Sequence, residues 1–487
     1  MRTRLRSRWR FMRRTVLIVR RFVQTLATMS IMLTLSACTQ LKQLPKWKLK
    51  LVSFTEGNTL RTEVHPTRTS HNMSADGRFV VFATRGYGDG TTTQSYMRDT
   101  FTGDLVRIDE PTDTVAFASG SDLPVVDEHG TRVLFAALTP FSGGSGMTHA
   151  QVWRRDISSG VLGEPAMLTV NEFGVEGDGD SCYDTRHQAY WPGLALSANG
   201  SMVGIATYAW NLSDTVDLND TLVYTRAVET AGNFLRMSET RDGVFATDRS
   251  FGPVLSATGA EIAFVSRAYN LPGGNSSPLV FKIYWRVTDD DAMSIRCLSC
   301  GRNGEGMVVP SDAPSLSPAI SADGNYVSFA SAASNLEVGT TRGDGSQYNI
   351  YIAENVDRSA DSAPTFLAPT GVATTDVNAM DTPATDDLRS SVSEDGRFIA
   401  FASKCRLADI ENHVTPCAAE AHQNIFLYDT SLDVFEQLTY GSDGDSYAPS
   451  MTPNANAISF VSEATDLLEG VSDENNGPDI YLLRWDS

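Results

Sequence analysis

One short pattern returns seven times along the chain. In its clearest form it is a Ser, two further residues and a Gly, followed by an alternating apolar strand whose large apolar residue lies five positions after the Gly. The turn residue is Gly77, Gly130, Gly200, Gly259, Gly324 or Gly396, and Ala455 takes its place in the seventh copy. A Gly-containing turn before an alternating apolar run predicts a β-hairpin. A hairpin repeated at one internal spacing indicates a repeat fold rather than a series of unrelated domains.

Two further strands follow each hairpin, and no long stretch shows helical periodicity. We label the four strands of a unit a, b, c and d. Third strands are predicted at 152–156, 222–226, 283–286, 350–353, 425–429 and 480–483. Tandem four-stranded units are typical of a β-propeller, in which each sheet is a blade packed against its neighbours around a central axis.

The two ends of the repeat region predict how such a ring closes. The seventh unit ends after its third strand, whereas an unpaired strand at residues 49–54 precedes the first unit. If the N-terminal strand completes the last blade, two open sheet edges disappear together. The predicted fold class is therefore all-β, a single propeller of seven four-stranded blades over residues 49–487. A six-bladed ring with a degenerate extra segment is the alternative.

Residues 1–37 are predicted to be a signal peptide, and residues 38–48 a lipidated cysteine with a linker. Nine arginines and no acid precede the apolar run at 22–37, which is too short to span a bilayer comfortably. That run ends in Leu35, Ser36, Ala37 and Cys38, which resemble the lipobox of bacterial lipoproteins, whose cysteine is acylated. An ordinary signal peptide or an uncleaved anchor is the alternative. With Thr39 next, the resemblance implies the outer membrane.

The chain without its signal is strongly acidic. The whole sequence carries 39 Lys+Arg and 59 Asp+Glu, a formal net charge of −20. Nine of the arginines lie in the signal, so 30 basic residues face 59 acids and the charge falls to about −29. An anion of this size repels nucleic acid and anionic lipid. We therefore expect no nucleic-acid partner, and contact with the membrane through the lipid anchor only.

Apart from Cys38 the chain has five cysteines. In an oxidising compartment Cys405 could pair with Cys417, and Cys297 with Cys300, and the fifth cysteine is then left over. A zinc site would need a second cysteine pair or nearby histidines, so none is predicted.

Several of the repeated phrases resemble a known family. They are Ser74–Ala83, Ser393–Ala402, Asn424–Asp429, and the triplets that begin at Ser334 and Thr465. These phrases are similar to the WD40-like (PD40) repeats of TolB-type propellers, and the resemblance covers residues 49 to the C-terminus. It implies the propeller fold, and the two triplets resemble a branch of the superfamily found in bacterial secreted proteins, but propellers host many unrelated activities. TolB also carries a separate N-terminal α/β domain, which has no counterpart here, so a Pal-binding role is not implied.

Loop lengths indicate where function lies. Strands alternate in direction, so the a–b and c–d turns share one face and the b–c and d–a loops share the other. Nearly all length variation is in the second set, and long variable loops on a rigid scaffold usually carry the binding residues. We therefore predict a binding site on this long-loop face. Its candidate residues are acids, aromatic rings and one histidine: Asp178, Asp180, His187, Trp191, Tyr208, Trp210, Tyr269, Asp443, Asp445 and Tyr447.

One long loop has the oxygen-rich composition of a calcium site. Asp473, Asn475 and Asp479 could hold Ca²⁺. The loop lacks the EF-hand spacing, and ordinary turns use the same residues, so a plain turn is the alternative. No other cofactor is expected.

Signals for catalysis are weak, because the histidines are scattered and neither H-E-x-x-H nor G-x-S-x-G occurs. We expect a lipid-anchored, non-enzymatic binding or scaffold module of the cell envelope, facing the periplasm or the cell surface, with a protein or glycan partner. A glycan-acting lyase or hydrolase that uses loop carboxylates in the propeller funnel is the alternative.

Overall fold

The computed structural model describes residues 47–485, apart from 55–63, 66–71, 86–91, 113, 114, 116, 118, 141–147, 185–188, 191, 192, 214–219, 231, 275–279, 290–293, 304–306, 337–347, 355–364, 371–387, 408–410, 412–418, 442 and 469–476. Leu49–Arg484 form one compact unit. Of the other described residues, Trp47, Lys48 and Trp485 belong to a second unit, and the rings of Trp47 and Trp485 meet edge to face at 5.5 Å. Among the described residues no helix is long and apolar enough to cross a membrane.

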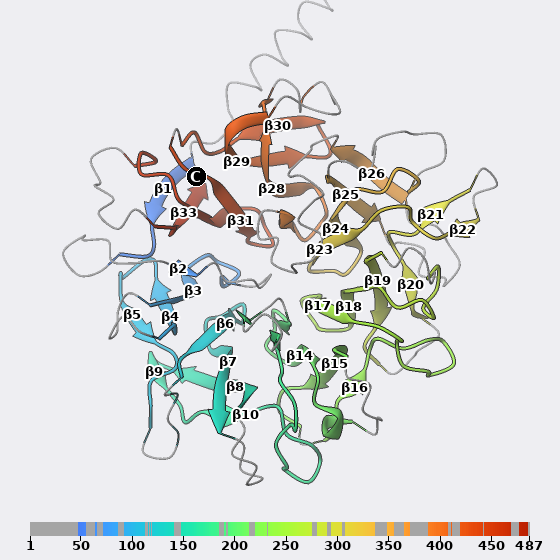
Figure 1. Cartoon of the computed structure of the whole chain (residues 1–487). Coiled ribbons are helices and arrows are strands. Elements are labelled where there is room, and N and C mark those ends of the chain that lie inside the picture. Colours follow the sequence, from blue (N-terminus) through green and yellow to red (C-terminus); the bar gives the residue numbers. More distant parts are fainter. Residues whose placement is uncertain are drawn as a thin grey trace, which may run out of the picture. The chain divides into compact units, whose positions relative to one another are not determined.

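Seven sheets surround an axis, as Figure 1 shows. Blade 1 is β2 (Val64–His65), β3 (Phe79–Thr84), β4 (Gln94–Asp99) and β5 (Leu105–Arg107). Blade 2 is β6 (Ser121–Val126), β7 (Arg132–Pro140), β8 (Thr148–Ser158) and β10 (Ala166–Met167), with β9 (Val161–Leu162) on the end of β8. Blade 3 is β13 (Leu194–Leu196), β14 (Met202–Thr207), β15 (Leu222–Ala227) and β16 (Leu235–Arg236). Blade 4 is β17 (Ser250–Leu255), β18 (Glu261–Ser266), β19 (Lys282–Val287) and β20 (Arg296–Cys297).

The last three blades follow the same order. Blade 5 is β23 (Ser315–Ile320), β24 (Tyr326–Ser331), β25 (Asn349–Glu354) and β26 (Thr365–Thr370). Blade 6 is β27 (Ser390–Val392), β28 (Phe398–Cys405), β29 (Ala419–Asp429) and β30 (Val434–Gln437). Blade 7 is β31 (Ser446–Met451), β32 (Ala457–Ser462), β33 (Asp479–Trp485) and β1 (Trp47–Leu51). Two small hairpins, β11 (Tyr183–Asp184) with β12 (Ala189–Tyr190) and β21 (Gly301–Arg302) with β22 (Val308–Val309), and the 3-10 helix η2 (Trp210–Leu212) lie in the loops.

The N-terminal strand closes the ring, as the sequence predicted. β1 lies beside β33 in the last sheet, so the blue and red ends of the chain meet in Figure 1. The pairing continues past β1, where Val52 N–H donates to Ile480 O at 2.8 Å. Ser53 Oγ donates to Asp479 Oδ1 at 2.6 Å and accepts from Ile480 N–H at 3.0 Å. The closing strand begins two residues earlier than expected, and the six-bladed alternative is wrong.

The apolar residue five positions after each turn Gly explains the core. Each of these residues faces an aromatic residue of the c strand across the ladder. The pairs are Phe82 with Tyr96, Phe135 with Trp153, Ile205 with Tyr224, Phe264 with Tyr284, Phe329 with Tyr351, Phe401 with Phe426, and Phe460 with Tyr481. These side chains are buried, and cross-strand aromatic pairs stabilise a sheet beyond their buried area.

The a–b turns form an inner ring on one face of the propeller. Backbone N–H groups of one turn donate to carbonyls of the next between blades 1 and 2, 2 and 3, 3 and 4, 4 and 5, and 6 and 7. A side chain of the preceding blade also packs against the turn Gly. At Gly396 this is Tyr326, whose Cγ would lie 2.4 Å from a Cβ on the glycine. Gly396 has a φ of +69°, and Ala455 takes the same left-handed conformation at +57° despite its side chain.

Arginines of the c strands join the first four blades to the blade before each. Arg98, Arg155, Arg226 and Arg286 occupy one position, two residues after the core aromatic, and they are buried. Arg98 donates to Val52 O of the closing strand at 3.1 Å, and Arg155 to Ile108 O at 2.9 Å. Arg226 donates to Leu168 O at 2.5 Å, and Arg286 to Met237 O at 3.2 Å. We call these contacts the arginine clamps.

Candidate functional site

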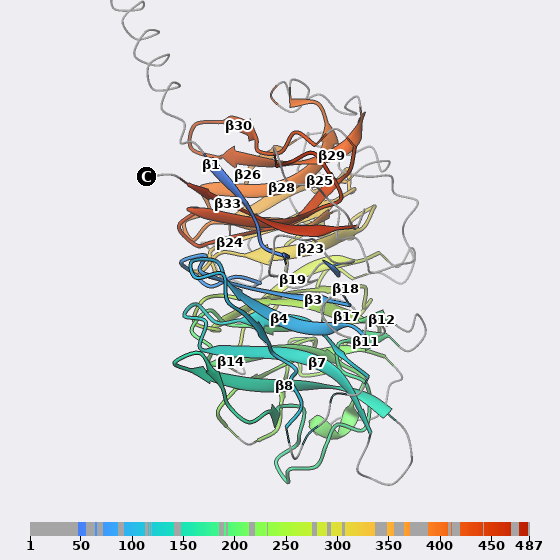
Figure 2. The same ribbon diagram turned by 90° about the vertical axis from the view of Figure 1, so that its left-hand side faces the viewer.

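The long-loop face carries the d–a and b–c loops, on the side of β11 and β12 in Figure 2. The opposite, short-turn face carries the a–b and c–d turns. The chain enters the propeller at the short-turn face, because the ammonium of Lys50 in β1 donates to Thr100 O in the c–d turn of blade 1. Any ligand of the long-loop face therefore meets it on the side away from the N-terminal entry.

Asp178 and Asp443 are two of the predicted binding residues. Each one joins its own d–a loop to the b–c loop of the following blade through hydrogen bonds. Asp178 N–H donates to Asn211 Oδ1 at 3.0 Å, and Asn211 N–H donates back to Asp178 Oδ1 at 3.3 Å. Asp443 Oδ1 accepts from Thr465 N–H at 2.9 Å, and the Thr465 hydroxyl donates to the other oxygen. These hydrogen bonds hold the pKa of Asp443 below its ordinary value, whereas burial raises that of Asp178. Both carboxylates thus hold the loops in shape.

Asp180 and Asp445 have a second, equivalent arrangement. Asp180 Oδ1 accepts from Ala150 N–H at 2.8 Å, and Asp445 Oδ1 accepts from Gln423 N–H at 2.8 Å. The residue before each donor is a histidine. His149 Nδ1 lies 3.5 Å from Asp180 Oδ1, and His422 Nδ1 lies 3.4 Å from Asp445 Oδ1. Burial raises the pKa of Asp180. His187, the histidine among the predicted binding residues, lies outside the described residues.

The predicted rings divide into buried and exposed members. Tyr447 is buried, and its hydroxyl donates to Glu463 Oε1 at 3.4 Å; Tyr208 packs against the core. Trp210 and Tyr269 are about half exposed at the same position of consecutive b–c loops, in blades 3 and 4. Among the described predicted rings, these two are the ones that a partner on this face can reach.

A row of apolar hairpin tips is a surface feature that sequence reasoning missed. Three consecutive d–a loops begin with a small hairpin closed by Asn171, Thr240 or Asn303, whose N–H donates to the carbonyl of Val175, Val244 or Met307. These three apolar residues are equivalent and are 49%, 50% and 62% exposed, and Phe173 on the first tip is more exposed still. The recurring signal is a polar residue, a Gly and then an aliphatic residue. We call Val175, Val244, Met307, Trp210 and Tyr269 the apolar row.

Several predicted residues lie outside the described part of the chain: Cys38, Trp191, Cys417, Asp473 and Asn475. Asp479, the third expected calcium ligand, is buried at the start of β33, where it accepts from Ser53. Within the described ranges no group of three or more His, Cys, Asp or Glu side chains is placed to hold a metal ion.

The cysteines follow the predicted pattern where the structure describes them. Cys297 and Cys300 form a disulfide. Cys405 is disulfide-bonded, and Cys182 is a free, buried thiol whose pKa burial raises.

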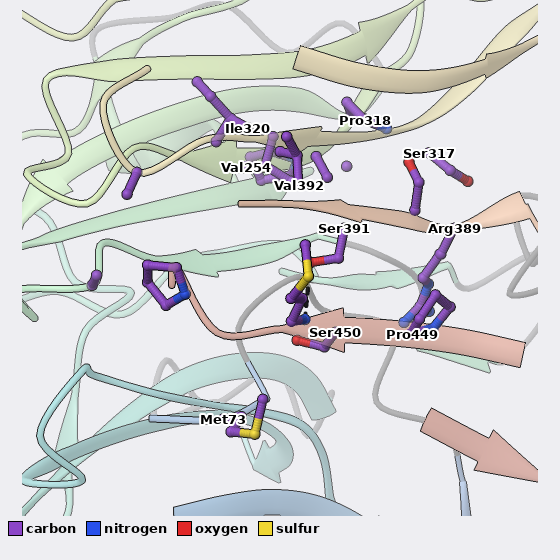
Figure 3. A pocket seen from close by; sticks show the side chains of 18 of the residues that line it. Met73, Val254, Ser317, Pro318, Ile320, Arg389, Ser391, Val392, Pro449 and Ser450 are labelled. Atoms are coloured by element: carbon purple, nitrogen blue, oxygen red, sulfur yellow. Dashed lines mark hydrogen bonds between the residues drawn. The ribbon is translucent and has the colours of Figure 1, made fainter. Parts of the chain in front are cut away.

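A cavity of about 100 Å³ lies on the axis, lined by residues of all seven a strands or their turns. Figure 3 shows Ser317, Arg389 and Pro449 toward one end of it and Met73 toward another side. Four of the a strands bulge at a left-handed residue that precedes a proline: Leu123, Gly252, Ser317 and Ala448. Bulges bend a strand and redirect its side chains, and Gly252, Ser317 and Pro449 from three of these bulges line the cavity.

The fold and these loops define a seven-bladed β-propeller. No protein-family model matches the sequence, and no curated protein does. Similar solved structures include an oligogalacturonate lyase in complex with manganese, 11% identical over 91% of this chain and 98% of that chain, with a TM-score of 0.50. Another is the β-propeller domain of the Trilobed protease from Pyrococcus furiosus, 8% identical over 88% of this chain and 96% of that chain, with a TM-score of 0.48. At such identities the likeness shows the fold alone.

Proposed function

We propose that the protein is a lipid-anchored, TolB-like propeller of the bacterial cell envelope that binds a protein or glycan through its long-loop face without catalysing a reaction. The apolar row supports this proposal most directly. Three equivalent hairpin tips and two equivalent loop rings are exposed in consecutive blades, and a repeated exposed apolar position is unusual for a surface that meets only water. Aromatic rings at such a site can stack on a peptide or on a sugar.

The start of the first described strand is consistent with this role, because Lys50 of β1 donates to Thr100 O on the short-turn side of the propeller, away from the long-loop face. Replacement of Cys38 by Ala should abolish incorporation of labelled palmitate and release the protein from the outer membrane. Unchanged labelling would contradict the lipid anchor. The binding face is tested separately.

The binding face is tested with matched serine variants of the full-length protein. The first carries Val175→Ser, Val244→Ser and Met307→Ser on the long-loop face. The control carries Phe101→Ser, Val161→Ser and Leu432→Ser, three similarly exposed residues of the c–d turns on the other face. Crosslinking in envelopes and a glycan array should lose their signal with the first variant and keep it with the control. The reverse pattern would contradict the face assignment.

A glycan-acting enzyme is the second candidate, and the axial cavity is the observation that favours it. The described residues that line the cavity include one carboxylate, Glu128, and one guanidinium, Arg389. Incubation of the purified protein with polyuronides and other glycans, with and without Ca²⁺, should give no product if the protein only binds. Turnover that Arg389→Gln removes would replace the binding proposal with a lyase or hydrolase.

A further inference from the structure

The disulfide between Cys297 and Cys300 lies at the base of the hairpin that carries Met307. Cys297 ends β20, the outer strand of blade 4, and the hairpin β21–β22 begins directly after Cys300. Both cysteines are buried, with 7% and 1% of their surface exposed. At the tip of the hairpin, Asn303 N–H donates to Met307 O at 3.1 Å. The disulfide therefore lies immediately below a member of the apolar row.

Blade 3 has an ion pair at the position where blade 4 has this disulfide. Arg236 and Glu239 pair at 3.0 Å, directly before the hairpin that carries Val244. They occupy the positions of the two cysteines, because the residue after Arg236 and the residue after Cys297 each donate through N–H to the c strand of their own blade at 2.8 Å. Each link joins residues three apart at the base of an apolar hairpin. In blade 4 the link is covalent, and a reductant can break it.

The b–c loop that carries Tyr269 packs against the same disulfide. Cys300 Sγ lies 3.7 Å from Pro272 O, and a Cβ on Gly273 would lie 2.3 Å from that sulfur. The same Cβ would lie 3.2 Å from a side chain of β22. Two thiols need more room than the disulfide they come from, because non-bonded heavy atoms pack at about 3.5–4.0 Å. Since this contact does not leave room for a methyl group, reduction should displace the Tyr269 loop, the hairpin or both.

We propose that the Cys297–Cys300 disulfide is a redox-sensitive link that sets the apolar row in blade 4, so that the oxidised protein binds its partner and the reduced protein binds it weakly. This inference rests on the proposed function, because the apolar row is the surface that the link controls. Displacement of Met307 and Tyr269 takes blade 4 out of line with the equivalent positions in blades 2 and 3.

The reductant of this link is a dithiol. One thiolate of the dithiol attacks Cys297 Sγ, the more exposed cysteine, and the S–S bond breaks with Cys300 leaving as a thiolate. The second thiolate of the dithiol then displaces Cys297 from the mixed disulfide. The dithiol becomes a disulfide, and its two protons pass to the two cysteines. Two electrons thus reduce the protein and come from the dithiol.

Reduction should act locally and leave the ring folded. The disulfide joins residues three apart, and a short closed loop restricts the unfolded chain less than a long one does. β20 remains paired with β19 through Cys297 and Arg296, and Ser299 Oγ accepts from Ile283 N–H at 2.8 Å. These contacts do not involve the sulfur atoms.

Hydrogen exchange of the full-length protein with and without dithiothreitol tests the link without any partner. Reduction should speed the exchange of amides at 301–303 about tenfold, as local opening does, and leave the equivalent hairpins at 171–175 and 240–244 within about twofold. A variant with Cys297→Ser and Cys300→Ser should exchange quickly at 301–303 without dithiothreitol, which separates this link from the disulfide of Cys405. Unchanged exchange at 301–303, or a disulfide that resists dithiothreitol in the folded protein, would overturn the proposal.

Crosslinking in envelopes separates this inference from the proposed function. The oxidised wild type should give the signal, and the variant with Cys297→Ser and Cys300→Ser should lose most of it while keeping a cooperative melting transition. Equal signals from the two proteins would remove the regulation alone. A wild type without any signal would remove the proposed function and the regulated binding together. Wild type treated with dithiothreitol replaces the variant if the variant does not fold.

Discussion

The two halves of the ring hold their blades together by different means. From the closing junction to blade 4, each blade reaches its predecessor through a buried arginine that donates to backbone carbonyls. In blades 5 to 7 the same position is Ala353, Tyr428 or Leu483, so the cation is replaced by an uncharged side chain. A buried cation fixes one geometry more strictly than apolar packing does, although it costs desolvation. The junctions from the closing strand to blade 4 therefore have a buried cation that the later junctions lack at this position, although the later blades also exchange hydrogen bonds, such as that from Met451 N–H to Ser391 Oγ.

The largest effect is expected from removal of the closing strand. Deletion of residues 49–54 removes the carbonyl of Val52 that Arg98 holds, and exposes the edge of β33. Loss of buried Leu51 and Val52 with their hydrogen bonds should cost about 5 kcal/mol or more. Calorimetry should show a broad, non-cooperative transition. A single sharp transition near the wild-type Tm would show that the ring does not depend on its first strand.

Arg286→Met should be the most damaging single change in the clamped half. Arg286 is fully buried, and it donates to Met237 O and, at 3.0 Å, to Glu239 Oε1. Removal of one partner of a buried ion pair should cost roughly 3 kcal/mol. Arg397→Met, at an exposed pair with Asp429, should cost about 0–1 kcal/mol. Urea midpoints compare the two, and equal losses would remove the distinction between the halves.

Lys282, whose ammonium donates to Val280 O at 3.2 Å, tests whether a buried lysine stabilises the clamped half. Burial lowers the pKa of Lys282 from 10.5 to about 8. Between these values the unfolded chain binds more protons than the folded chain, so the free energy of unfolding rises with pH. We expect Lys282→Met to be the more stable protein at pH 7, with the wild type recovering between about pH 8 and 10.5. Denaturant titrations across this range measure the difference, and a constant difference would place the lysine in contact with a charge or with water.

The smallest effect is expected at Ala455, in the unclamped half. Its left-handed backbone costs an alanine roughly 1–2 kcal/mol, and Gly removes that cost but adds about 0.5–1 kcal/mol of chain entropy. Ala455→Gly should therefore raise stability by less than about 1 kcal/mol. Gly324→Ala is the opposite control, because its Cβ would lie 2.7 Å from Glu261 Oε2 at a φ of +73°. Stabilisation by both changes, measured as a shift in Tm, would contradict this account of the turn.

The sequence predicts the ring well because its signals are local. Each blade contains its own turn Gly, the apolar residue five positions later and the aromatic c strand. The unpaired strand at 49–54 matches the one blade that lacks a fourth strand. The arginine clamps cannot be predicted in this way, although each arginine lies two residues after the aromatic residue of its c strand in the sequence. Their acceptors, such as Leu168 O for Arg226, belong to another blade and have no side-chain signature.

The candidate site was predicted less well for a related reason. Acidic pairs in loops suggest ligands, but Asp178 and Asp443 satisfy backbone groups of a neighbouring loop, which are not visible from composition. The apolar row consists of single aliphatic residues in polar turns, and one exposed valine means little until three blades place it identically. Where Arg389 lies relative to the axis depends on strand direction and on the bulges, which only the assembled ring fixes.

The seven a–b turns have a consequence for the order of the chain. At six of the seven turns a side chain of the previous blade packs against the turn Gly, as Tyr326 packs against Gly396. Because this contact between neighbouring blades recurs around the ring, the fold does not require the chain termini to lie in the last blade. A circular permutant that opens between blades 5 and 6 and links residue 485 to residue 47 should assemble into the same ring.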